Sequence, residues 1–68
     1  MINNNVHIIL SATKKYWMII FKGDCVSIHT FKFNARRDAR RLAKFYESKL
    51  VIHRSDGRIT KVVNYENI

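Results

Sequence analysis

The chain has no proline and only one cysteine, Cys25. A single cysteine cannot close an intramolecular disulfide, which excludes a disulfide-stapled scaffold and indicates a reducing compartment. The longest apolar run, at 16–21, is far too short to span a bilayer. The opening MINNN carries no basic side chain ahead of an apolar segment, so we expect no signal peptide. We therefore expect a cytoplasmic protein that does not bind membranes, with Cys25 as a half-buried, unreactive thiol.

Acidic residues are also scarce. Thirteen lysines and arginines against five acidic residues give a formal net charge of +8 at pH 7. This excess is larger than solubility requires in a chain of 8.1 kDa. Such a field attracts polyanions, which include nucleic acid, an anionic membrane or an acidic protein face.

Length and composition indicate one domain over residues 1–68, with residues 1–5 as a flexible polar arm. The hydrophobic share of 47% is enough for a globular core. A single core in so short a chain rarely supplies more than about 3–5 kcal/mol, and oligomerisation is a usual supplement. A small sheet exposes its edges and one face, so we expect that two copies can form a homodimer.

Short β-branched and aromatic segments predict strands. They lie at 6–10, 16–21, 26–31, 50–54 and 59–65, the last as a strand or a loosely paired tail. A turn at 22–24 joins the second and third segments, so the first three strands are expected to form an antiparallel meander. The turn at 55–58 contains Asp-Gly, a strong hairpin signal in which both turn residues need positive φ.

Between the third and fourth strands the apolar period becomes that of a helix. The positions on its apolar face are Ala35, Ala39, Leu42, Ala43 and Tyr46. Asn34 is one candidate N-cap, and Thr30 is a rival that would start the helix a turn earlier. The order β-β-β-α-β-(β) predicts an α+β fold, in which one helix packs on a face of a small antiparallel sheet of four to five strands. The expected core comprises Ile8, Trp17, Ile19, Phe21, Ile28, Ala39, Leu42, Ala43, Tyr46, Leu50 and Ile52.

The segment LVIHRSDGRI at 50–59 follows a helix with alanines spaced by four, and a tyrosine, Tyr65, lies shortly after it. With a tryptophan on an early strand, this pattern resembles a family of short prokaryotic proteins catalogued as a domain of unknown function, whose members end in LVIH-x-x-DGRI. The matching positions are Trp17, Ala35, Ala39, Leu42, Ala43, Leu50, Val51, Ile52, His53, Asp56, Gly57, Ile59 and Tyr65. Because that family has no agreed activity, the resemblance implies the fold and a bacterial, plasmid or phage origin, and no mechanism.

The polar face of the predicted helix is strongly basic. Arg36 with Arg40, and Arg37 with Arg41, are like-charge pairs at i, i+4, which destabilise an isolated helix by a few tenths of a kcal/mol each. A partner that neutralises the arginines explains why a marginally stable chain keeps them, and a purely solvated face is the alternative. The candidate binding residues are Arg36, Arg37, Arg40, Arg41, Lys44, Arg54 and Arg58. The same patch is extended by Lys14, Lys15, Lys22 and Lys61.

Two functions fit this face. In the first, a small non-catalytic module contacts nucleic acid phosphates, without sequence-specific readout because no GXXG loop, RNP motif or zinc spacing is present. In the second, an inhibitor or adaptor of phage or mobile-element type docks on an acidic face of a host protein or nucleoprotein complex. Phe31, Phe33, Phe45 and Tyr46 flank the basic run, and arginines with aromatics make interface hot spots. If the helix begins near Lys32, Phe33 lies on the arginine face.

Catalysis and metal binding are not expected. His7, His29 and His53 lie on three different predicted strands without ligand spacing, so we expect no metal and no other cofactor. His53 precedes the Asp-Gly turn and is expected to hydrogen-bond it. Ser27 and His29 share one face of a strand, but no third group is evident, so no catalytic residue and no enzyme activity are predicted.

Overall fold

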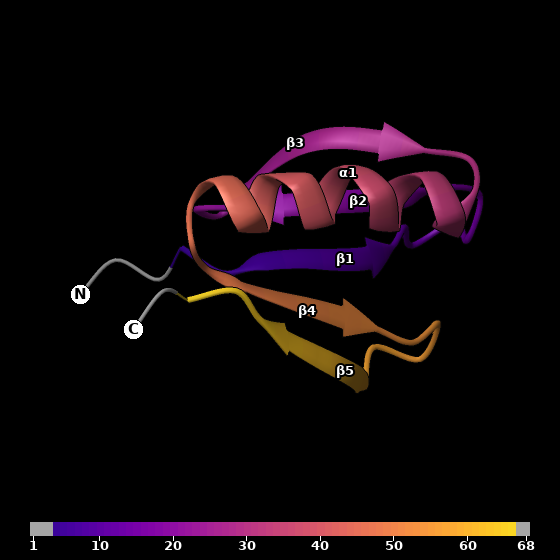
Figure 1. Cartoon of the computed structure of the whole chain (residues 1–68). Helices are drawn as coiled ribbons and strands as arrows, with labels where there is room; N and C mark the ends of the chain where they lie inside the picture. The colour runs from indigo at the N-terminus through magenta and orange to yellow at the C-terminus, as the bar shows by residue number, and fades with distance from the viewer. Residues whose placement is uncertain (1–3, 67–68) are drawn as a thin grey trace.

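One helix lies on one face of a five-stranded sheet, as the change of apolar period predicts (Figure 1). The computed structural model describes residues 4–66. The strands are β1 Val6–Leu10, β2 Trp17–Phe21, β3 Asp24–His29, β4 Lys49–His53 and β5 Ile59–Asn64, and the helix is α1 Lys32–Phe45. The α+β fold is therefore confirmed, with the strand order β3-β2-β1-β4-β5. Of the predicted polar arm, residues 1–3 lie outside the described residues, and the side-chain oxygen of Asn5 accepts a hydrogen bond from the Lys49 N–H at 3.4 Å.

The sheet is mixed, because one of its strand pairs is parallel. β1, β2 and β3 form the expected antiparallel meander. β1 and β4 run parallel, with Val6 opposite Leu50 and Ile8 opposite Ile52. The expectation of a wholly antiparallel sheet is wrong for this pair. The helix returns the chain to the end of the sheet where β1 begins, so β4 must enter alongside β1 in the same direction.

The β2–β3 and β4–β5 turns reverse the chain with different backbone conformations. Lys22 and Gly23 both have positive φ, at 54° and 81°, which matches a two-residue turn between β2 and β3. In the turn between β4 and β5 only Gly57 has positive φ, at 91°. The N–H of Gly57 donates to the carbonyl of Arg54 at 2.9 Å, and the N–H of Arg54 donates to the carbonyl of Arg58. These two bonds define a three-residue loop with glycine in the left-handed position, so the expectation of two positive φ values is wrong for this turn.

Three alanines let α1 lie close to the sheet. Ala35, Ala39 and Ala43 are fully buried, and they pack in one cluster with Ile8 and Ile19. Ile28 and Tyr46 are 57% and 44% exposed, so their assignment to the core was wrong. Ile28 is opposite Met18 on the face of the sheet that points away from the helix. Tyr46 is the C-cap residue of α1, and its ring packs at the rim against Phe21 with the centroids 4.7 Å apart.

Two local expectations at the surface are also corrected. The helix begins at Lys32 with Phe31 as N-cap and no capping side chain, so neither Asn34 nor Thr30 caps it. β3 ends at His29 and α1 begins at Lys32, so the connection between them is short. The end of the strand therefore determines where the helix begins. Cys25 is exposed rather than half-buried, and its Sγ lies 3.5 Å from the Ser27 carbonyl.

The residue after the helix carries a backbone cost that a substitution can remove. Glu47 has φ 51°, and the next N–H, of Ser48, closes the helix end on the carbonyl of Ala43 at 2.9 Å. A non-glycine residue in this left-handed region costs about 1–2 kcal/mol. Glycine removes this cost, but its greater conformational entropy in the unfolded chain cancels part of the gain. Glu47→Gly is therefore expected to stabilise the protein by about 0.5–1 kcal/mol, which raises Tm by about 2–8 °C in thermal denaturation. Glu47→Ala removes the charge and keeps the strain, so an equal gain from alanine would contradict the backbone explanation.

Candidate nucleic-acid interface

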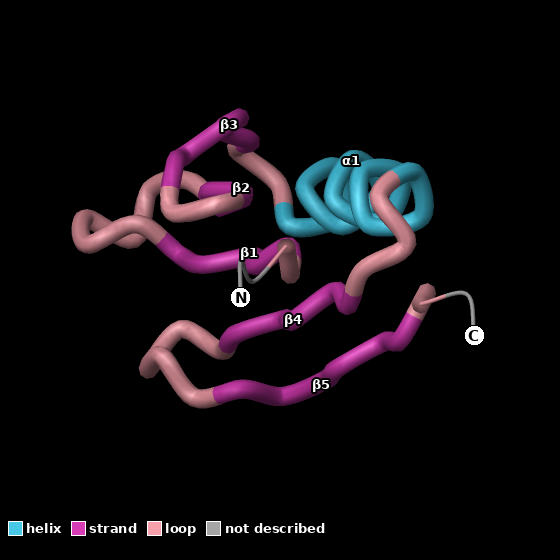
Figure 2. Tube along the Cα trace, turned by 90° about the vertical axis from the view of Figure 1, so that its left-hand side faces the viewer, coloured by secondary structure: helices cyan, strands magenta, loops and turns pink. Residues whose placement is uncertain are grey.

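A groove with a volume of about 370 Å³ separates α1 from the outer end of the sheet. The helix packs on β1, β2, β3 and β4, whereas β5 lies beyond its contacts. Figure 2 shows the β4–β5 hairpin diverging from the helix. The groove is lined by Phe33, Arg36, Arg37 and Arg40 of α1, by Leu50 and Ile52 of β4, and by Lys61, Val63 and Tyr65.

Helix periodicity and strand pairing together aim these side chains into the groove. Arg36 and Arg40 each follow a buried alanine, so they leave the helix about 100° around from the stripe that faces the sheet. On the other side, Lys61 is opposite Ile52 and Val63 is opposite the buried Leu50, which places both on the helix side of the sheet. The helix thus forms a basic wall, and β4 with β5 forms a largely apolar floor.

The groove contains four cations and no lining carboxylate. Within residues 4–66, Arg36, Arg40 and Lys61 form no ion pair, and Arg37 is 4.0 Å from the neighbouring Asp38. Arg36 and Arg40 are also the like-charge i, i+4 pair that weakens the helix. Arg36, Arg40 and Lys61 are therefore available to an anionic ligand.

Aromatic rings border the same cations. Phe33 is 73% exposed and shares the groove with the arginines, as predicted for a helix that begins near Lys32. Tyr65 is half-buried, and its N–H donates to the Ser48 carbonyl at 3.0 Å. Lys44 extends the basic wall, because its Nζ lies 5.6 Å from the centroid of the Tyr65 ring. We did not predict Tyr65 as a site residue, although its alternation with Lys61 and Val63 is the signal that could have placed it there.

The remaining predicted site residues lie elsewhere. Arg41 is on the opposite flank of α1, where it lines a second hollow of about 330 Å³ with Asp38, Leu42 and Phe45. Arg54 and Arg58 lie in the turn between β4 and β5 and line neither hollow, and Arg58 is 3.7 Å from Asp56. The structure thus brings Arg36, Arg37, Arg40 and Lys44 together on one flank and separates the other three.

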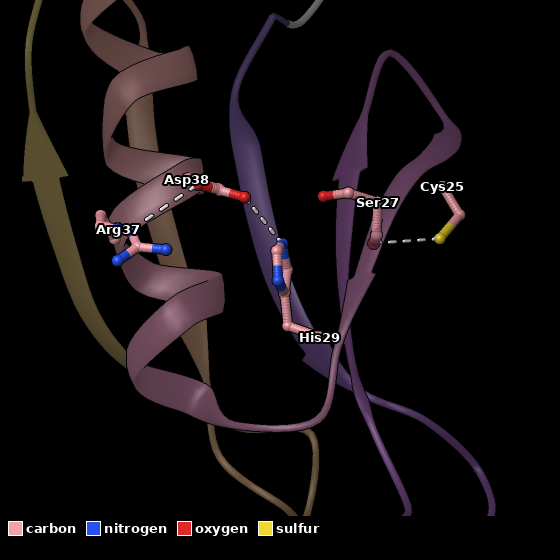
Figure 3. A network of polar contacts seen from close by, with 5 residues as sticks. All are labelled: Cys25, Ser27, His29, Arg37 and Asp38. Carbon is pink, nitrogen blue, oxygen red and sulfur yellow. Dashed lines mark hydrogen bonds and ion pairs between the residues drawn. The ribbon is translucent and has the colours of Figure 1, made fainter.

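His29 makes a contact between the helix and β3. Its Nε2 lies 3.0 Å from Oδ2 of Asp38, which points from α1 toward the strand (Figure 3). Ser27 and His29 share one face of β3, as predicted. They are opposite Ile19 and Trp17, so this face is the one toward the helix. The Ser27 hydroxyl forms no hydrogen bond with His29 in the described chain. The sequence analysis found no third polar group beside Ser27 and His29. In the structure Asp38 of α1 lies next to His29, and this contact joins the helix to β3.

The other two histidines bond each other across β1 and β4. Nδ1 of His7 lies 3.0 Å from Nε2 of His53, whose Nδ1 is 3.1 Å from the Gly57 carbonyl. The expected bond from His53 to the turn is confirmed. Because a carbonyl only accepts, His53 donates from Nδ1 and its Nε2 accepts from His7. Among residues 4–66 no group of three histidine, cysteine or acidic side chains is arranged to hold a metal ion.

This histidine pair makes stability depend on pH. Burial, and then the positive charge of the neighbouring His53, lower the pKa of His7 below the ordinary histidine value. The unfolded chain therefore binds this proton more readily, so stability is full above about pH 6.5 and is lost as the pH falls through the lower folded-state pKa. We expect the free energy of unfolding, from urea titrations at pH 7 and pH 5, to drop less in His7→Gln than in the unchanged protein. Equal drops would contradict this role of His7.

No helix in the described part of the chain is long and apolar enough to cross a membrane. The family resemblance carried by residues 35–59 stays a prediction. Comparisons of the chain with protein-family models, with curated proteins and with solved structures found no match.

Proposed function

We propose that the groove between α1 and β5 binds the phosphate backbone of nucleic acid, with little sequence preference. The observation that carries this proposal is a set of four cations, Arg36, Arg37, Arg40 and Lys61, around one groove that no carboxylate lines. Phosphates displace condensed counterions when they meet such cations, which supplies most of the affinity of non-specific complexes. Arginine adds bidentate hydrogen bonds to phosphate oxygens.

The aromatic side chains favour a single strand over a duplex. Bases of a single strand are free to stack on exposed rings, and such stacking tolerates any sequence. Phe33 offers an exposed ring at the basic wall, and Tyr65 lies beside Lys44 at the sheet edge. In this role the protein holds its partner and catalyses no reaction.

Fluorescence anisotropy with labelled single-stranded DNA, duplex DNA and duplex RNA tests the proposal across a salt series. We expect micromolar or tighter binding at about 50 mM salt, strongest for the single strand, with log affinity falling linearly with log salt. No binding to any of the three at low salt would overturn it.

A second candidate function rests on the apolar floor of the groove. Leu50, Ile52 and Val63 lie beneath the cations, an arrangement that also suits a protein segment with acidic and apolar side chains. An inhibitor or adaptor that docks on an acidic host protein would use it in this way. Docking with an apolar centre resists salt and requires one particular partner, whereas phosphate binding is steeply salt-dependent and indifferent to partner identity.

A further inference from the structure

The face of the sheet opposite the helix is apolar and is covered by no described element (Figure 2). The strand registers place six aliphatic or methionine side chains on it, because these positions alternate with or pair against the core-facing ones. They are Ile9, Met18, Ile20, Ile28, Val51 and Val62. Ile28 is 57% exposed and Val62 is 52% exposed, whereas Ile9, Met18 and Ile20 are half-buried and Val51 is buried by its neighbours in the sheet.

The charge on this face is low. The histidines at its centre, His7 and His53, bond each other. Lys49, at one end of β4, is the charged residue that the described strands place there, and its Nζ is 3.7 Å from Glu66. The arginines of the groove lie on the other side of the molecule, along α1. Within residues 4–66 this side thus presents an almost neutral surface, although the net charge of the chain is +8.

We propose that this face packs against the same face of a second copy of the chain. The distribution of charge favours that occupant. An acidic partner finds no free cation in the centre of the face, whereas a like-charged copy can approach because its arginine helix points away. Pairing through the helices would bring two strongly positive surfaces together. The face-to-face arrangement leaves both grooves open on the outside of a symmetric dimer.

The size of the face sets the expected strength of the dimer. Five strands about 4.8 Å apart, each of about five residues at about 3.3 Å, give a face of about 400 Å². Two such faces bury about 800 Å², below the roughly 1,200–2,000 Å² of stable complexes. The dimer is therefore expected to be reversible, with a dissociation constant in the micromolar range or weaker. It also supplies apolar burial that a domain this small lacks.

Sedimentation equilibrium of the whole chain, from micromolar to millimolar concentration in high salt to strip bound polyanions, tests the proposal. The mass is expected to rise with concentration from 8.1 kDa toward twice that value. The double variant Ile28→Lys with Val62→Lys places charges in the interface of both copies and is expected to remain monomeric. The matched variant Ala12→Lys with Thr30→Lys adds the same charge at exposed positions outside the strands and is expected to dimerise like the unchanged chain.

Circular dichroism first establishes that the variants are folded. If the double lysine variant fails to fold, Val62→Thr keeps β-branching, removes apolar surface, and is expected to weaken dimerisation. An unchanged chain that stays monomeric at millimolar concentration would overturn the proposal, and so would a folded face variant that dimerises as well as the matched control. Neither result depends on whether the groove binds nucleic acid.

Discussion

Replacing Arg36, Arg40 and Lys61 together with glutamine is expected to lower the affinity for single-stranded nucleic acid about a hundredfold at low salt. Each cation that meets a phosphate contributes about 0.7 to the slope of log affinity against log salt on a single strand. Loss of three contacts therefore flattens this slope by about 2, and the affinities of the variant and the unchanged protein converge as salt rises. Anisotropy titrations at several salt concentrations measure both quantities.

The matched control is the triple variant Lys15→Gln, Arg41→Gln and Arg58→Gln. Like the groove variant, it lowers the formal net charge from +8 by three, to +5, but its positions do not line the groove. It is expected to change the affinity by less than about fivefold, since only long-range attraction is lost. If both triple variants lose affinity equally, binding follows net charge and the groove has no special role.

Loss of folding does not explain the expected result. Arg36 and Arg40 are exposed and repel each other at i, i+4, so glutamine at both is expected to stabilise the helix by a few tenths of a kcal/mol. Lys61 is exposed on β5 and forms no ion pair within residues 4–66. A Tm of the variant equal to or higher than that of the unchanged protein would show that the variant is folded. The lost affinity would then be due to the missing contacts.

Local chemistry predicts most of the fold. Short β-branched and aromatic segments locate all five strands, and the switch to a 3.6-residue period locates the helix, because each signal depends on residues a few positions apart. The parallel pairing of β1 with β4 depends instead on where the helix delivers the chain after it crosses the sheet. The helix start at Lys32 was missed for a related reason, since the end of β3 at His29 fixes it without any capping side chain.

The site is predictable from the sequence only in part. Helical spacing separates Arg36 and Arg40 from the apolar stripe, so their exposure follows from the pattern. Arg41 follows Arg40 directly, yet a step of about 100° carries it to the opposite flank. The groove itself requires β5 to extend the sheet beyond the contacts of the helix, which no local pattern predicts. Lys61 and Tyr65 therefore join the arginines only in the folded chain.

Ala39→Leu is expected to destabilise the protein by about 2–3 kcal/mol, most of the roughly 3–5 kcal/mol that a core of this size supplies. Ala39 is fully buried between the helix and the sheet, midway along the stripe from Ala35 to Ala43. Leucine adds three carbons where the two layers are in contact, so the helix must shift or the side chain must adopt a strained rotamer. Urea denaturation is expected to show a much lower midpoint, or an unfolded fraction already present without urea.

Arg41→Leu is the matched control, because it places the same side chain on an exposed position of the same helix. Alanine, arginine and leucine have similar helix propensities, so a difference between the two variants reports packing rather than helix formation. An Ala39→Leu midpoint equal to that of Arg41→Leu would show that the contact between helix and sheet is looser than the structure places it. The same contact sets the groove, since Arg36 and Arg40 are each one residue along from a stripe alanine. If Ala39→Leu remains folded, a displaced helix should therefore also weaken nucleic acid binding, although no residue of the groove has changed.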